Sequence, residues 1–161
     1  MEIGNLISTL ILKNFLDFFL ANIDPVKTMT REQVYSFMLY SLFNIKYRIQ
    51  ITGARDYTDE TVVKQALKEF IPEYCVLVHG NCSGADKLCG EIATKLGFEV
   101  EVFPAQWNKY GRAAGPLRNI QMLDTKPNVV LVFHPCVEKS KGTKHCATEA
   151  EKRNLLVKYY K

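Results

Sequence analysis

The sequence predicts an α/β protein with a Rossmann-like parallel sheet and helices on both faces of that sheet, preceded by an N-terminal helical hairpin. From residue 46 onward, short apolar runs alternate with amphipathic stretches, which is the pattern of strands and helices in a parallel sheet. Before residue 46 the chain carries two strongly apolar segments instead. We therefore divide the chain into a helical extension at 1–45 and a Rossmann-like domain at 46–161.

The first apolar segment, at 6–23, is almost long enough to span a membrane. Lys13 and Asp17 lie near its middle, and each would cost roughly 2.5–3.5 kcal/mol at the centre of a spanning helix. With Thr9 they form one narrow polar stripe. We expect no membrane span but a helix buried against protein on most of its circumference; a helix bound at a membrane surface is the alternative.

A second helix is predicted after the break at Asp24-Pro25, because Thr30 and Gln33 have the spacing of a capping box. The resulting hairpin either covers the following domain or joins subunits. Since the following domain looks complete without it, we favour a homo-oligomer that forms through residues 1–45.

The domain after residue 46 has the predicted order βαβαβαβαβ. Its strands are predicted at 47–51, 75–78, 98–103, 128–133 and 155–160. Its helices are predicted at 59–71, 84–96, 115–123 and 143–154. Asp59 is the expected N-cap of the first helix, Gly97 ends the second and Pro116 lies near the start of the third. The run at 128–133 is the most apolar, which predicts the centre of the sheet.

The composition fits one globular domain, since 47% of the 161 residues are hydrophobic and 24% are charged, which excludes a disordered tail. Five cysteines without a CxxC pair favour a reducing compartment, so we expect a cytoplasmic protein. The net charge of +4 permits an anionic ligand without requiring nucleic acid.

Ligands bind parallel sheets at the carboxyl ends of the strands, so the loops after the strands form the candidate site. These loops are rich in glycine, arginine, aspartate and small polar residues, and they lie at 52–56, 79–86, 104–115 and 134–142. The loops at the opposite ends of the strands are plain. This asymmetry predicts a binding site at the carboxyl edge.

The loop from Gly80 to Gly84 leads from a strand into a helix, where glycines let backbone N–H groups approach an anion. Ser83 adds a hydroxyl donor, and the alternative is a tight turn without a ligand. Asp86 lies in the first turn of that helix, where an acid is favoured by the helix dipole in any case.

Arg55 follows the Gly53 turn and offers a planar set of donors to a phosphate or carboxylate. Asp56 either orients Arg55 or accepts from a ribose hydroxyl, and the alternative is a surface ion pair of little value. Gly142-Thr143 is either a second phosphate-binding turn or, with Thr143, an ordinary N-cap.

Arg118 and Asn119 face the same edge and either bind a ligand or are solvated. Trp107 and Tyr110 either stack against a base or hold their own loop in place. A zinc site is the remaining possibility, but its candidate ligands lack the usual spacing, and we expect no metal and no cofactor. Those candidates are His134, Cys136, His145 and Cys146.

Several motifs of these loops stand in a fixed order along the chain. They are Gly53-Ala54-Arg55-Asp56-Tyr57-Thr58-Asp59, Val78-His79-Gly80-Asn81-Cys82-Ser83-Gly84-Ala85-Asp86, Phe103-Pro104-Ala105-Gln106-Trp107, Ala114-Gly115-Pro116-Leu117-Arg118-Asn119 with Met122-Leu123, and Gly142-Thr143. In this order and spacing they resemble the YspA/YpsA-related branch of the SLOG superfamily, over about residues 46–158. The resemblance implies a Rossmann-like fold that binds nucleotides or nucleotide-derived molecules.

The resemblance also implies the site residues, motif by motif. The implied ligand-binding residues are Gly53, Arg55, Asp56, Gly80, Ser83, Gly84, Asp86, Gly115, Arg118, Asn119, Gly142 and Thr143. Relatives in the wider superfamily include the "lonely guy" phosphoribohydrolases, which cleave the N-glycosidic bond of nucleoside monophosphates. Others sense ADP-ribose-type signals, and DprA-type relatives bind single-stranded DNA.

One departure from the phosphoribohydrolase pattern, Gly-Gly-x-Gly-Thr-x-x-Glu, weakens the enzyme interpretation. The first two glycines are missing here, and Cys146 stands where the glutamate would be. Glu149 lies nearly one turn further on and would substitute only if the helix were shifted. The lysines around this turn, Lys139, Lys141 and Lys144, suit a polyanionic ligand instead.

We therefore expect a binder of a phosphate-bearing nucleotide derivative, of the ADP-ribose or nucleoside-phosphate type. Phosphate would lie on the turns at 80–84 and 142–143 and pair with Arg55 and Arg118, while Asp56 or Asp86 would accept from ribose hydroxyls. The alternative is a nucleotide N-glycosidase or phosphoribohydrolase, whose catalytic candidates are Arg118, Asp86 and Glu149. A single-stranded nucleic-acid binder ranks last, because the basic residues form no long run.

Overall fold

The computed structural model describes residues 29–161, and the predicted helix at 6–23 lies outside the described residues. The strands are β1 (Tyr47–Gly53), β2 (Cys75–His79), β3 (Glu99–Val102), β4 (Val129–Phe133) and β5 (Leu156–Tyr160). The helices are α3 (Arg31–Phe43), α4 (Glu60–Leu67), α5 (Ala85–Lys95), α6 (Trp107–Tyr110), α7 (Ala114–Asp124) and α8 (Lys141–Lys152). Short 3₁₀ turns occupy Pro72–Tyr74, Gly111–Ala113 and Val137–Lys139.

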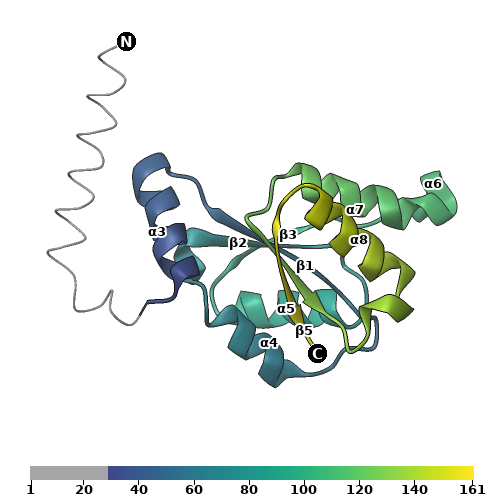
Figure 1. The fold of residues 1–161 in the computed structure, drawn as a ribbon, viewed down its shortest axis with the longest axis horizontal. Coiled ribbons are helices and arrows are strands. Elements are labelled where there is room, and N and C mark those ends of the chain that lie inside the picture. The colour runs from purple at the N-terminus through teal and green to yellow at the C-terminus, as the bar shows by residue number, and fades with distance from the viewer. Residues whose placement is uncertain (1–28) are drawn as a thin grey trace, which may run out of the picture.

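All five strands pair in parallel, in the order β3-β2-β1-β4-β5. Helices α4 and α5 cover one face of the sheet, and α7 and α8 cover the other (Figure 1). This arrangement confirms the predicted Rossmann-like α/β fold. The expectation that the most apolar strand lies at the centre is wrong, because β1 lies there. Every residue of β4 is buried all the same, since β4 has a strand on each side and helices on both faces.

The core has two parts, one on each side of the sheet. The larger part joins α4 and α5 to β1, β2 and β4 around Ile49, Leu77 and Phe133. The smaller part joins α7 and α8 to β4 around Leu123, Val130 and Ala147. Side chains of β4 alternate between the two parts, as the period of two in a strand requires.

The caps explain where several helices begin and end. Asp59 accepts from the backbone N–H of Val62, which confirms it as the N-cap of α4. Gly97 follows α5 with a φ of 88°, the left-handed conformation expected after a helix. Helix α8 begins at Lys141, so Thr143 is not its N-cap; Ser140 is, and its Oγ accepts from Thr143 N.

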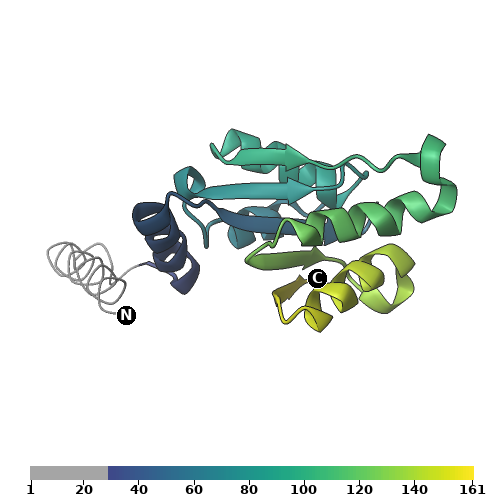
Figure 2. The same cartoon turned by 90° about the horizontal axis from the view of Figure 1, so that it is seen from above.

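Helix α3 has the predicted capping box and is anchored to the domain at its amino end. Thr30 Oγ1 donates to the carbonyl of Glu69 at 2.6 Å, and Gln33 Nε2 donates to the carbonyl of Lys68 at 3.1 Å. Lys158 on β5 forms ion pairs with Glu32 of α3 and with Glu69. Figure 2 shows α3 at one end of the described molecule and α6 at the other. Within residues 29–161, no helix is long and apolar enough to cross a membrane.

Candidate ligand-binding cavity

A cavity of about 730 Å³ lies at the carboxyl edge of the sheet, between the loop after β1 and the beginnings of α7 and α8. Its walls include most of the predicted ligand-binding residues. They are Gly53, Arg55, Asp56, Asp86, Gly115, Arg118, Asn119, Gly142 and Thr143. A second hollow of about 400 Å³ is lined by Gly80 and Ser83 and shares Arg55, Cys82 and Trp107 with the first. Neither Gly84 nor Glu149 lines either space.

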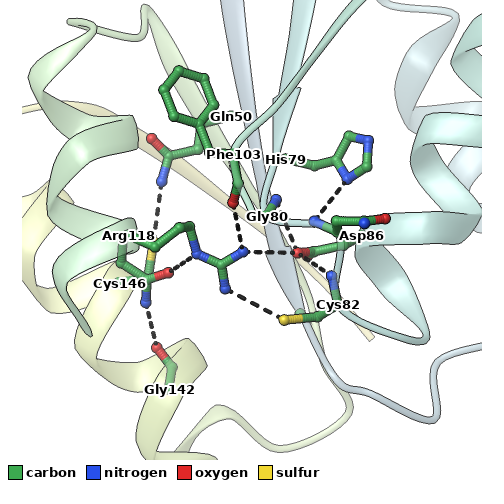
Figure 3. Close-up of polar contacts among 12 residues, drawn as sticks. Gln50, His79, Gly80, Cys82, Asp86, Phe103, Arg118, Gly142 and Cys146 are labelled. Carbon is green, nitrogen blue, oxygen red and sulfur yellow. Dashed lines mark hydrogen bonds and ion pairs between the residues drawn. The ribbon is translucent and has the colours of Figure 1, made fainter. Parts of the chain in front are cut away.

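Arg118 is buried in the cavity wall and forms the centre of a cluster of polar contacts (Figure 3). Its Nε donates to Asn119 Oδ1 at 3.1 Å, and its Nη1 donates to the carbonyl of Phe103 at 3.4 Å. Its Nη2 donates to the sulfur of Cys82 at 3.3 Å, and Nη1 lies 3.8 Å from Asp86 Oδ2. Arg118 therefore directs donors from all three guanidinium nitrogens to protein groups and joins α7 to the loop after β2.

Asp86 organises that loop from the first turn of α5. Its Oδ2 accepts from the backbone N–H groups of Gly80 at 3.0 Å and Cys82 at 3.2 Å. Between these two residues, the N–H of Asn81 donates to His79 Nδ1 at 3.2 Å. Three consecutive N–H groups of the predicted phosphate-binding turn thus donate to acceptors within the protein. In a phosphate-binding turn these groups would donate to the ligand instead.

Burial shifts the pKa values of Asp86 and His79, the two side chains that accept hydrogen bonds from this loop. It raises the pKa of the Asp86 carboxyl, while Arg118 and the two backbone N–H groups act in the opposite direction. Burial, together with the nearby charge of Arg118, lowers the pKa of His79. A neutral His79 can accept the Asn81 N–H, so this lowered pKa preserves the loop hydrogen bond.

Two glycines of this loop are required by close packing. A Cβ atom at Gly80 would lie 1.2 Å from Nη1 of Arg118, so any side chain there would displace the guanidinium. Gly84 has a φ of 71°, and a Cβ atom there would lie 2.3 Å from the carbonyl oxygen of Ala54. The structure therefore gives both residues a packing role in a tight turn, which the sequence analysis had held as the alternative to ligand binding.

The first cavity is lined by more cationic than acidic side chains. Five residues are cationic, namely Arg55, Arg112, Arg118, Lys139 and Lys141, against the acidic Asp56 and Asp86. Within residues 29–161, Arg118 is the one member of this cationic set that has an ion pair. The other four, Arg55, Arg112, Lys139 and Lys141, are exposed, and we call them the cavity cations.

The amino end of α8 meets the loop after β1 on the floor of this cavity. Thr143 Oγ1 donates to the carbonyl of Gly53 at 3.0 Å, which joins the two segments. Gly142 lies in the first turn of α8, where backbone N–H groups have no acceptor within the helix. The helix dipole adds a partial positive charge at the same place.

Two of the three predicted catalytic candidates, Arg118 and Asp86, line this cavity as an ion pair, and the third, Glu149, does not line it. Glu149 lies on α8 outside the cavity and pairs with Lys152 at 2.7 Å. Cys146, at the position of the phosphoribohydrolase glutamate, is fully buried and accepts from Gln50 Nε2 at 3.1 Å. Burial raises the pKa of Cys146 to about 11, so the thiol stays protonated at neutral pH.

The cavity residues absent from the predicted ligand set include Arg112, His134 and His145. Arg112 lies in the 3₁₀ turn after α6, on a long loop whose path no local pattern indicated. His134 follows β4 and accepts from the backbone N–H of Cys136 at 2.9 Å. His145 has a buried Nδ1 without a hydrogen-bond partner in the described structure. Both histidines had been weighed only as zinc ligands, and the described residues contain no metal-binding group of three His, Cys, Asp or Glu side chains.

Comparison with known proteins gives two matches. The family model of the YspA, cpYpsA-related SLOG family matches residues 47–110, from the first residue of β1 to the last residue of α6. The Gene 61 protein of Mycobacterium phage D29 is 38% identical over 118 residues, which cover 68% of this chain and 93% of that protein. No solved structure matches the chain.

Proposed function

Because this chain belongs to the YspA, cpYpsA-related SLOG family, we propose that it binds a phosphate-bearing, nucleotide-derived small molecule in the cavity at the carboxyl edge of the sheet. Family membership by itself supports a nucleotide-related function in general. The proposed ligand is of the ADP-ribose or nucleoside-phosphate type. The observation that carries the proposal is the set of four cavity cations, none of which forms an ion pair within residues 29–161.

The phosphate would lie at the amino end of α8. Lys139 and Lys141 flank this end, and Gly142 supplies backbone N–H in the first turn. Arg55 faces the same cavity from the loop after β1, and its planar guanidinium suits a phosphate oxygen pair. The loop after β2 contributes less than the sequence suggested, because the N–H groups of residues 80–82 already have acceptors.

Calorimetric titration with AMP, ADP and ADP-ribose tests this proposal. We expect Arg55→Ala to weaken binding at least about tenfold, since a hydrogen bond to a charged group contributes about 1.5 kcal/mol or more. Arg31→Ala is the matched control, because Arg31 is also an exposed arginine but lies on α3, outside the cavity. Equal affinities of wild type and Arg55→Ala for every ligand that binds would count against the site.

A nucleotide N-glycosidase is the second candidate, and one observation favours it. Asp56 lines the cavity with a carboxylate that has no hydrogen bond or ion pair within residues 29–161. Asp86, by contrast, is engaged by two backbone N–H groups and Arg118. Chromatography of the same nucleotides after incubation would reveal a released base, and Asp56→Asn should abolish that release. If every nucleotide stays intact over prolonged incubation, the N-glycosidase proposal fails and the binding function is the one that remains.

A further inference from the structure

The two hollows meet at a shared boundary of three residues: Arg55, Cys82 and Trp107. A ligand that fills both would therefore run past Arg55, Cys82 and Trp107. On the basis of the proposed function, we infer that the ligand carries an aromatic base as well as a phosphate, and that this base stacks on Trp107 while the phosphate lies at α8.

The two spaces differ in charge, which gives the ligand a direction. Arg112, Lys139 and Lys141 line the first cavity and not the second, so the phosphate belongs in the first. Apart from Arg55 and Trp107, the second hollow is lined by small neutral residues. These are Gly80, Asn81, Cys82, Ser83, Pro104 and Ala105. Such walls suit a flat, uncharged ring whose edge can hydrogen-bond to amide and hydroxyl groups.

The indole of Trp107 is placed as a stacking surface. Trp107 opens α6 and is 48% exposed, so about half of this side chain is accessible to a ligand. A Cβ atom at Gly115 would lie 3.3 Å from Cη2 of this ring, so Gly115 allows the indole to lie close to the start of α7. A base that lies on this ring would gain stacking from the indole, and Arg55 in the wall of the same hollow supplies a nearby positive charge.

This placement commits the site to a class of ligand. Inorganic phosphate and sugar phosphates would occupy only the first cavity, whereas a nucleotide would occupy both spaces. A free nucleotide and the end of a single-stranded nucleic acid both carry a base and a phosphate. The small size of the second hollow, about 400 Å³, favours the free nucleotide.

Fluorescence provides a direct test, because Trp107 is the chain's single tryptophan. We expect AMP or ADP-ribose, added to the full chain, to quench the emission of Trp107. Ribose 5-phosphate should bind more weakly, as measured by calorimetry, and leave the emission unchanged. Calorimetric binding of the nucleotides without any change in emission would overturn the stacking inference and leave the proposed function intact. No binding of any probe would overturn both.

Substitution separates stacking from a general structural role. Trp107→Ala should weaken AMP binding about 5- to 150-fold, the range expected for loss of one stacked base, and leave ribose 5-phosphate binding unchanged. Trp107→Phe should retain part of the AMP affinity. Tyr110→Ala is the matched control, because Tyr110 is an exposed aromatic of the same helix that lines neither hollow. Equal losses for AMP and ribose 5-phosphate in Trp107→Ala would contradict the inference.

A short oligothymidylate distinguishes the two sources of the base. We expect it to bind more weakly than AMP. Tighter binding of the oligonucleotide, with an affinity that falls steeply as salt is raised, would overturn the free-nucleotide assignment in favour of a nucleic-acid strand.

Discussion

Arg118 lines the cavity, yet the donors of its guanidinium are directed at groups of the protein. It is buried with Asp86, and the pair holds the loop after β2 against α7. The sequence predicts that Arg118 pairs with phosphate, and in the structure its guanidinium contacts Asp86, Asn119, Phe103 and Cys82.

We therefore expect Arg118→Met to lower the free energy of unfolding by about 3–5 kcal/mol, because it leaves the buried Asp86 carboxyl without its charged partner. Urea denaturation measures this change. The double variant Arg118→Met with Asp86→Asn should lose less than the sum of the two single changes, since the unpaired charge is then removed. Unchanged stability of Arg118→Met, together with loss of nucleotide binding, would instead assign Arg118 to the ligand.

At the scale of the elements, the hydroxyls of Ser140 and Thr143 hold the amino end of α8 in place. Ser140 Oγ accepts from Thr143 N, while Thr143 Oγ1 donates to Gly53 at the end of β1. Ser140 thus sets where α8 begins, and thereby where its first-turn N–H groups face the cavity.

Ser140→Ala should reduce the free energy of unfolding by about 1 kcal/mol, the usual cost of losing an N-cap. It should also weaken nucleotide binding, because fraying of the first turn would disperse the N–H groups at Gly142. Thermal unfolding and calorimetry measure the two effects. Asp59→Ala, which removes the N-cap of α4 outside the cavity, is the matched control and should lower stability without changing affinity.

The sequence predicted the elements well because alternation of apolar residues reports burial, and burial in this fold follows from helices on both faces of the sheet. It did not place Ser140 as a cap, because Gly142-Thr143 offered an equally good local pattern and the contact with Gly53 joins residues 90 positions apart. The sequence did predict that the loops meet at the carboxyl edge of the sheet. It could not show that Asp86 takes the N–H groups of Gly80 and Cys82, because that depends on how the loop folds back on α5.

At the scale of the whole molecule, the domain leaves several apolar side chains of α3 uncovered. Apolar side chains surround this helix, yet Ser36 is its one fully buried residue, and Tyr35, Tyr40 and Phe43 are exposed. A helix that is apolar all round is normally covered on all sides. The homo-oligomer predicted for residues 1–45 would provide that cover with a second copy of the chain.

We expect the full chain to form an oligomer that Phe43→Glu shifts toward monomer, because Phe43 is 61% exposed and a carboxylate there would resist burial. Light scattering over a range of protein concentrations measures the mass. Leu156→Glu is the matched control, since Leu156 is 48% exposed on the edge strand β5. A monomeric wild type, or the same mass for wild type and Phe43→Glu at every concentration, would refute this arrangement.

The placement of α3 next to the amino ends of β1 and β2 has a thermodynamic consequence. Its Tyr35 and Tyr40 contact Tyr47 and Tyr74, whereas the cavity lies at the carboxyl ends of the strands. Subunits joined through α3 would leave each cavity open to solvent, so ligand exchange would not require the subunits to separate. Assembly and occupancy would then be uncoupled equilibria, and ligand affinity would be the same at protein concentrations above and below subunit dissociation.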